Sequence, residues 1–159
     1  MILAIISDTH LPKGTRRLPD ACVERMRGAD AILHAGDVFE LAVYRQIEQL
    51  GPPLHAVRGN VDSAELRLIL PATRVVERRI AMIHDAGPAP GRLMRMRRMF
   101  PDVAAVVFGH SHIPLHEERD GFQTFNPGSP TERRRSPRHT MGMVSLTTER
   151  LEFELVDLD

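Results

Sequence analysis

The sequence predicts a layered α/β fold, and two observations support that prediction. Over the first two thirds of the 159-residue chain, short runs rich in Val, Ile and Ala alternate with segments that have helical patterns. Continuous apolar runs of this length are typical of strands buried on both faces, and strands that alternate with helices indicate α/β layers. The last third instead carries hairpin signals, so we expect antiparallel strands there.

Five buried strands and three helices are expected before the change of pattern. The strands are ILAIIS (2–7), AILHAG (31–36), LHAVRG (54–59), IAMIHD (80–85) and VAAVVFG (103–109). The helices cover residues 18–28, 40–51 and 90–100. Pro near the start of the first helix, and Gly at the ends of the first and second, stand where these residues are favoured.

Antiparallel β structure is expected in the C-terminal third. Asp120-Gly121 lies between two strand-like runs, and this dipeptide is a strong hairpin signal. Residues 140–158 are read as two further strands that flank a turn at Glu149-Arg150. Between the two pairs, residues 126–139 (NPGSPTERRRSPRH) are expected to form an exposed loop, because Pro, Gly and Ser are frequent in it.

Composition and charge are those of an ordinary globular protein. Lys plus Arg and Asp plus Glu both total 21, so no global field attracts nucleic acid or an anionic membrane. The one cysteine excludes an internal disulfide, and with no signal or membrane segment in the sequence it predicts a cytoplasmic protein. No linker divides the sequence, so residues 1–159 are expected to form one domain, and a homo-oligomer is left open.

Candidate metal ligands follow all five predicted strands. Ligands of open α/β sheets bind beyond the carboxyl ends of the strands, so side chains at these ends are expected to meet. Oxygen and nitrogen donors stand there at seven positions: Asp8, His10, Asp37, Asn60, His84, His110 and His112. A glycine precedes Asp37, Asn60 and His110, and would allow a tight turn beneath a bound ion.

The chemistry of these donors indicates borderline divalent ions. Four imidazoles, two carboxylates and one amide, with no thiolate, suit Mn, Fe, Co, Ni or Zn better than Cu(I) or Ca. Seven donors are too many for one ordinary site. If one carboxylate bridges, the donors divide between two ions about 3.5 to 4 Å apart, which is the spacing in two-metal phosphatases and nucleases.

In order and spacing, these motifs resemble the calcineurin-like metallophosphoesterase superfamily. The matching series is Asp8-x-His10, Gly36-Asp37, Gly59-Asn60-x-Asp62, His84 and Gly109-His110-Ser111-His112, and NPGS at 126–129 resembles a later turn. Within the superfamily, the short chain is similar to the small single-domain prokaryotic phosphodiesterases. The resemblance implies a four-layer α/β/β/α sandwich with two mixed β-sheets and a metal-dependent phosphoesterase activity.

The resemblance also implies a role for each ligand. The first divalent ion would take Asp8, His10 and His112, the second would take Asn60, His84 and His110, and Asp37 would bridge. Manganese is the first choice for both ions, with nickel, iron, cobalt or zinc as alternatives. A hydroxide shared by the ions would attack phosphorus directly, so Asp37, Asn60 and His110 act through that hydroxide and the bound phosphate, without a phosphoenzyme.

Two positions depart from the family pattern. Val61 stands where the larger phosphatases have a histidine that protonates the leaving group, and loss of such an acid costs most with basic leaving groups. A small phosphodiester or activated ester is therefore the expected substrate, with a phosphomonoesterase or nucleotidase as the alternative. Asp85 replaces the usual glycine after His84, where a carboxylate narrows the pocket, lowers its positive charge and could approach the second ion.

A further alternative belongs to another class of protein. A subunit of the eukaryotic retromer coat resembles this family and uses the fold as a scaffold for protein contacts, having lost part of the ligand set. The complete set of seven donors here argues against a non-catalytic scaffold.

Residues beside the ligands allow two interpretations each. Arg58 either forms a structural ion pair or reaches a substrate phosphate. Asp62 either caps a short helix that begins near Ser63 or supports the ligands from behind. Thr9 and Ser111 are turn residues that could also hydrogen-bond a ligand.

The remaining histidines and one group of arginines lie outside the ligand set. His34 is expected to be a core residue, and the other histidines outside the ligand set are expected on the surface or in strands. The arginines at 133, 134, 135 and 138 are either a solvated loop or a means of steering substrate, since guanidinium groups suit phosphate.

Overall fold

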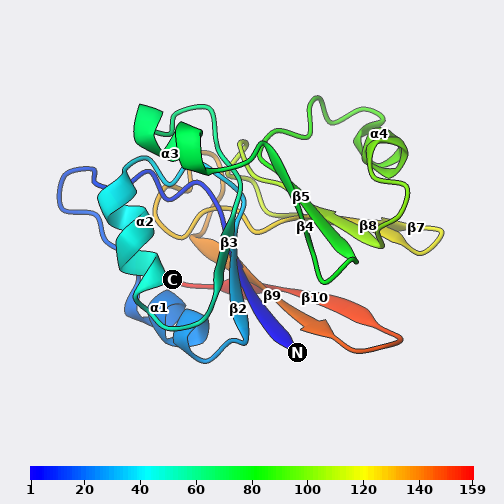
Figure 1. Ribbon diagram of the computed structural model, residues 1–159, viewed down its shortest axis with the longest axis horizontal. Coiled ribbons are helices and arrows are strands. Elements are labelled where there is room, and N and C mark those ends of the chain that lie inside the picture. Colours follow the sequence, from blue (N-terminus) through cyan, green and yellow to red (C-terminus); the bar gives the residue numbers. More distant parts are fainter.

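Two five-stranded β-sheets pack face to face in the computed structural model, which describes residues 1–159. The first sheet has the strand order β10-β9-β1-β2-β3, with β1 parallel to β2 and antiparallel to β9. Its strands are β1 (Ile2–Ile6), β2 (Ala31–His34), β3 (Leu54–Ala56), β9 (Thr140–Leu146) and β10 (Leu151–Asp157). In Figure 1 the first three strands lie at the centre, and β9 and β10 extend to the lower right.

The second sheet has the strand order β4-β5-β6-β8-β7 and is also mixed. β6 is parallel to both β5 and β8, whereas β4 and β7 are antiparallel edge strands. The strands are β4 (Thr73–Val76), β5 (Ile80–Ile83), β6 (Ala105–Val107), β7 (Leu115–Arg119) and β8 (Phe122–Asn126).

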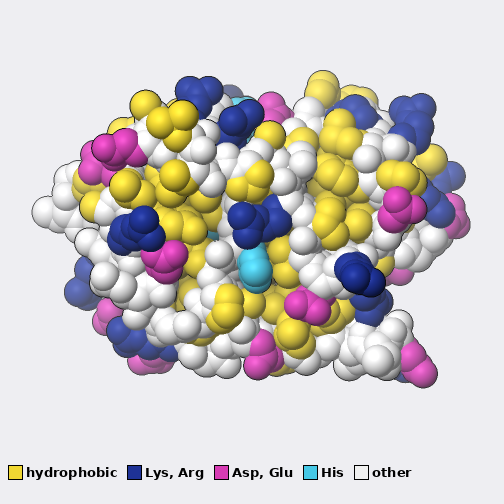
Figure 2. All heavy atoms as spheres, in the orientation of Figure 1, with side chains coloured by type: hydrophobic (Ala, Val, Ile, Leu, Met, Phe, Trp, Pro, Cys, Tyr) yellow, Lys and Arg dark blue, Asp and Glu magenta, His cyan; other side chains and the backbone are white.

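Helices cover the outer face of each sheet. α1 (Asp20–Arg27) and α2 (Leu41–Glu48) lie against the first sheet, and α4 (Arg92–Met99) lies against the second (Figure 1). α3 (Ala64–Ile69) is a short helix after β3. No helix of the protein has the length and apolar character needed to cross a membrane. Acidic, basic and apolar side chains are interspersed on the face seen in Figure 2, in keeping with the balanced charge.

Three apolar clusters separate these layers. Alternation along β1 turns Ile6 toward α1 and α2 and Ile5 toward the second sheet. Ile5 packs there with Met82 in the cluster between the sheets, and Met96 of α4 packs with Val106 on the far side. The order of the layers in space is therefore helices, first sheet, second sheet, helix, so the predicted four-layer α/β/β/α sandwich is confirmed.

The predicted elements are confirmed with shorter bounds, but β4 was not expected. It pairs antiparallel with β5, and Thr73 lies opposite Ile83. The turn between them contains Glu77 and Arg78, whose φ angles are 52° and 55°. Tight hairpin turns with positive φ usually carry Gly, Asn or Asp, so the sequence gives no signal of this turn.

The expected exposed loop at residues 126–139 is wrong for its first half. Ser129 and Thr131 are buried, and their hydroxyl groups donate to the main-chain oxygens of Asp8 and Thr9 at 2.8 and 2.6 Å. These bonds fasten the segment onto the chain that leaves β1. A polar composition predicted exposure, whereas the polar groups here satisfy backbone acceptors in the interior.

Candidate metal centre

All seven predicted donors lie together, just beyond the carboxyl ends of β1, β2, β3, β5 and β6. The chain is strained there. Positive φ angles occur at Asp8 (56°), His10 (47°), Asp37 (58°), His110 (70°) and His112 (61°). Residues other than Gly adopt such angles in only a few per cent of cases, and clusters of them are typical of functional sites.

One group of donors consists of Asp8, His10 and His112, all buried or nearly so. Asp8 Oδ1 lies 3.5 Å from His112 Nε2 and 3.9 Å from His10 Nε2. Ser7 Oγ donates to Asp8 Oδ2 at 2.7 Å, and the main-chain N–H of His110 donates to the same carboxylate. The Asp8 carboxylate is therefore fixed from behind while its Oδ1 faces both imidazoles.

A second group forms around Asn60. Its Oδ1 lies 3.0 Å from His84 Nε2 and 3.1 Å from His110 Nδ1. Asp37 joins the groups, because its Oδ2 lies 3.2 Å from His84 Nε2 and 3.3 Å from His10 Nε2. The main-chain N–H of Val61 donates to the other oxygen of Asp37 at 3.0 Å and holds the carboxylate in this position.

These residues fit metal ions. The Nε2 atoms of His10 and His112 are buried and make no hydrogen bond, which is costly for a nitrogen that no ligand approaches. His112 Nδ1 donates to Glu132 O, and His84 Nδ1 donates to Ala35 O at 2.8 Å. Such bonds set the tautomer and leave the Nε2 lone pair of each ring free for an ion.

Electrostatics also couple the two groups. Burial alone would lower the pKa of His10, but the carboxylates of Asp37 and Asp8, 3.3 and 3.9 Å from Nε2, outweigh it and raise that pKa to about 9. Burial likewise opposes ionisation of Asp37, yet His10 and His84 bring the pKa of this carboxyl well below its usual range. The metal-free site therefore holds protons on imidazoles that a cation would displace.

Glu132 is a residue that the sequence did not single out. Its Oε2 is buried without a hydrogen bond and lies 3.5 Å from His10 Nδ1. Its Oε1 is held by Lys13 Nζ at 2.9 Å and Arg16 at 3.6 Å, and its main-chain oxygen accepts from His112. One residue thus orients both histidines of the first group. Its position, 20 residues beyond His112 in an irregular segment, carries no local signal.

Asp62 and Arg58 differ from the structural roles first considered for them. The interpretation of Asp62 as a helix cap is wrong, because Ser63 Oγ accepts from Leu66 N at the start of α3. The carboxylate of Asp62 instead accepts from the main-chain N–H groups of Gly59 and Phe39, which braces the turn that carries Asn60. Arg58 is exposed and forms no ion pair, so the interpretation of Arg58 as a member of a structural ion pair is wrong as well.

Asp85 lies at the rim of the site. Its Oδ2 is 4.0 Å from His110 Nε2, and its Oδ1 accepts from the main-chain N–H of Gly87. Val61 is also at the rim, with 37% of its surface exposed. The Thr9 hydroxyl contacts His34, which is fully buried as expected, and donates to the main-chain oxygen of Asp37 at 3.4 Å. Ser111 Oγ accepts from Asn126 and bonds to no predicted ligand.

Two of the predicted glycines are required for close approach rather than for a turn. A Cβ at Gly109 would overlap Ser7 Oγ and come within 2.7 Å of Asp8 Oδ2. A Cβ at Gly59 would overlap Oδ1 and N of Asp37. The backbones of these loops therefore pack directly against the two carboxylates.

The family model of the calcineurin-like phosphoesterase superfamily domain matches residues 1–149. The chain belongs to this superfamily. Among its relatives, a probable metallophosphoesterase of Methanothermobacter thermautotrophicus is 30% identical over 161 residues, which cover 98% of this chain and 92% of that protein. The recognised family is thus confirmed, and the metal-ligand motifs lie inside the matched region.

Solved structures share the fold of this phosphoesterase domain. Vps29 of Chaetomium thermophilum has a TM-score of 0.79 at 17% identity, covering 98% of this chain and 96% of that one. A structure described as an archaeal phosphodiesterase has a TM-score of 0.73 at 22% identity, covering 99% and 100%. At these identities the likeness establishes the fold alone.

Proposed function

We propose that this protein is a dinuclear metal-dependent phosphohydrolase and that its substrates are phosphodiesters. The observation that supports this most directly is the position of Asp37, whose Oδ2 lies 3.3 Å from His10 Nε2 and 3.2 Å from His84 Nε2. His10 belongs to one group of donors and His84 to the other. One carboxylate between two groups is the arrangement that a bridging ligand requires in a two-metal site.

The donor set suits two manganese-type ions, and its side chains differ in how far they are exposed to solvent. When bound, the ions supply positive charge for a phosphate group and lower the pKa of a water molecule that attacks phosphorus. The side chains of His112 and His84 are 0% and 5% exposed, so they form the side of the site that solvent does not reach. His110, with 46% of its side chain exposed, and Asn60 face solvent, so the phosphate enters on their side.

We favour diesters as substrates because Val61, the residue after Asn60, has no acidic proton in its side chain. Val61 holds Asp37 through its main chain and offers no proton from its side chain. A general acid contributes about 10²- to 10⁴-fold, so its absence disfavours strongly basic leaving groups such as serine. The fold shared with an archaeal phosphodiesterase agrees with this substrate class.

A non-catalytic scaffold is the second candidate, because Vps29 structures share the fold over 98% of the chain. The Nε2 of His112, which is buried and makes no hydrogen bond, favours the enzyme. A scaffold gains nothing from this atom, and such a group reduces stability when nothing binds to it.

A matched pair of substrates tests the proposal. Manganese-loaded protein should hydrolyse bis(4-nitrophenyl) phosphate faster than 4-nitrophenyl phosphate, since both release 4-nitrophenol and differ in the second ester. Asp37→Asn should abolish the activity while the far-ultraviolet circular dichroism stays unchanged. Faster cleavage of the monoester would support the monoesterase, and no cleavage of either by metal-loaded protein would support the scaffold.

A further inference from the structure

A basic pocket opens beside the metal centre. It has a volume of about 580 Å³, and no hydrophobic side chain lines it. Arg16 and Arg17 come from the segment after β1, and Arg133 and Arg134 come from the segment before β9. Glu132 and His139 complete its polar wall. Segments more than a hundred residues apart in sequence therefore converge to place four guanidinium groups around one hollow.

The charges in this basic pocket are not balanced. Arg133 and Arg134 have no carboxylate within 4.0 Å, and their recorded bonds go to main-chain oxygens. Arg16 must share Glu132 with Lys13. Arg17 pairs with Asp20 at 3.7 Å, but both side chains are 81% exposed, so the pair is screened by water. The chain as a whole has no net charge, so this excess is a local concentration.

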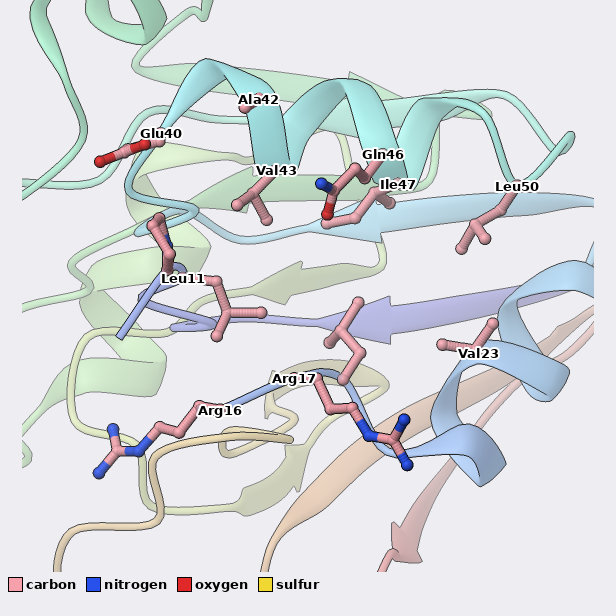
Figure 3. A pocket seen from close by; sticks show the side chains of 12 residues that line it. Leu11, Arg16, Arg17, Val23, Glu40, Ala42, Val43, Gln46, Ile47 and Leu50 are labelled. Atoms are coloured by element: carbon pink, nitrogen blue, oxygen red, sulfur yellow. The ribbon is translucent and has the colours of Figure 1, made fainter. Parts of the chain in front are cut away.

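The side chains of Arg16 and Arg17 also show which way their guanidinium groups point. Figure 3 shows Arg16 and Arg17 at the edge of a neighbouring apolar cavity, with their guanidinium groups turned away from α2. The aliphatic parts therefore cover apolar surface while the charged ends are presented on the other side, toward the basic pocket.

Two residues connect the basic pocket to the metal centre. Glu132 lines it and contacts both His10 and His112. Arg134 lines it and donates to the main-chain oxygen of His110 at 3.5 Å. A molecule that occupies the basic pocket therefore lies one residue away from three predicted ligands.

We propose that the basic pocket binds a second phosphate group of the substrate, distal to the phosphodiester that is cleaved. Guanidinium groups bind phosphate with two parallel hydrogen bonds, and neither Arg133 nor Arg134 forms an ion pair within 4.0 Å that a phosphate would have to displace. The substrate class is then a diester that carries an additional phosphomonoester, such as a nucleotide with a diester at its 5′-phosphate and a phosphomonoester at its 3′-hydroxyl. This inference rests on the proposed function, since it assigns a distal subsite to the same reaction.

Two nucleotide esters that differ by one phosphate isolate this contact. Thymidine 5′-(4-nitrophenyl phosphate) and its 3′-phosphorylated form share the scissile bond and the leaving group. With the metal-loaded protein, the 3′-phosphate should lower KM about tenfold and leave kcat unchanged, as expected for a charge-assisted contact made equally in ground and transition states.

The variant R133A/R134A should remove this preference, and R97A/R98A is its control. The control also loses two positive charges, but from α4, against the second sheet. Equal KM values for the two esters with the native protein, or a preference that survives in R133A/R134A, would overturn the proposal.

Binding measured by calorimetry keeps this test separate from that of the proposed function. If the metal-loaded protein cleaves neither ester, the proposed function fails. The subsite is then judged from binding of the same two nucleotides, because a 3′-phosphate contribution that depends on Arg133 and Arg134 would still support it. Equal affinities would overturn it.

Discussion

Glu132 Oε2 lies 3.5 Å from His10 Nδ1, on the opposite side of the ring from Asp37. The carboxylate is fixed by Lys13 and Arg16 and therefore sets the orientation of the imidazole. Glu132→Ala should weaken metal binding about 10- to 100-fold, the usual effect of removing a group that orients a ligand. Glu132→Gln should retain most of the affinity, because an amide oxygen would still face Nδ1 from the position of Oε2.

Competition with a fluorescent chelator measures this effect without reference to activity. Glu154→Ala is the matched control, since Glu154 is exposed and lies on β10. Native affinity in Glu132→Ala would show that His10 is positioned without Glu132.

His110→Ala should lower turnover strongly without unfolding the protein. Its side chain is 46% exposed, so little packing is lost, but one donor of the second group disappears. Loss of several kcal/mol of transition-state stabilisation corresponds to about 10³-fold in kcat. His55→Ala, which removes a half-buried histidine that contacts Arg74, should leave kcat near the native value. A native rate in His110→Ala would exclude this residue from the reaction.

Metal binding should release protons and tighten as pH rises toward 9. The pKa of His10 is about 9 because Asp37 and Asp8 outweigh its burial, so the metal-free ring is protonated at neutral pH. An ion binds only the neutral ring, and each displaced proton weakens binding about tenfold per unit fall in pH. Calorimetry in buffers with different ionisation enthalpies counts these protons. A count of zero at pH 7.5 would contradict the arrangement around His10.

The raised pKa of His10 should also make the stability of the metal-free protein depend on pH. The folded pKa of His10 lies above its ordinary value of 6.5, so the protonated ring stabilises the fold. That contribution is complete below pH 6.5 and is lost as pH rises through about 9. The Tm of the metal-free protein should fall over this range, and His10→Ala should lack this component of the fall.

Gly109→Ala should disturb the site through packing alone. The added methyl group would overlap Ser7 Oγ and crowd Asp8 Oδ2. Overpacking of this kind costs about 1 to 3 kcal/mol in the free energy of unfolding, and the displaced carboxylate should bind metal more weakly. Gly28→Ala is the control, because its Cβ would meet nothing nearer than 3.5 Å. Denaturant unfolding that ranks the two variants equally would rule out this close approach.

Asp85→Asn should lower KM for a diester about two- to fivefold, because it removes a negative charge 4.0 Å from His110 at the mouth of the site. The effect is small because the Asp85 side chain is 59% exposed and water screens it. Initial-rate measurements at low ionic strength are the check, with Asp102→Asn, which is also exposed, as the control. A rise in KM would instead indicate that Asp85 helps to hold an ion.

The seven donors could be predicted from the sequence because each one stands directly after an apolar run that predicts a strand. Asp8 and His110, for example, stand directly beyond apolar runs that are typical of buried strands, and parallel strand ends meet at one edge. The four layers came from the resemblance, since local patterns do not state how many sheets form. The two donor groups and the carboxylate between them also came from the resemblance, and the structure adds the distances that bring these atoms together.

What the sequence could not predict depends on contacts between distant segments. Glu132 reaches His10 across 122 positions, and nothing in an irregular loop marks a buried acid. The sequence left two interpretations of Asp62 open, and the helix cap is the wrong one because Ser63, one position later, is the cap and leaves the Asp62 carboxylate free to accept from another loop. β4 was missed because its turn uses residues that rarely adopt positive φ.

Titration of the metal-free protein with manganese, with bis(4-nitrophenyl) phosphate hydrolysis followed at each point, tests the central claim most directly. Two donor groups that share Asp37 predict that turnover appears mainly with the second equivalent and stops rising at two ions per chain. Full activity at one ion per chain, or no activity once two are bound, would contradict the dinuclear phosphodiesterase.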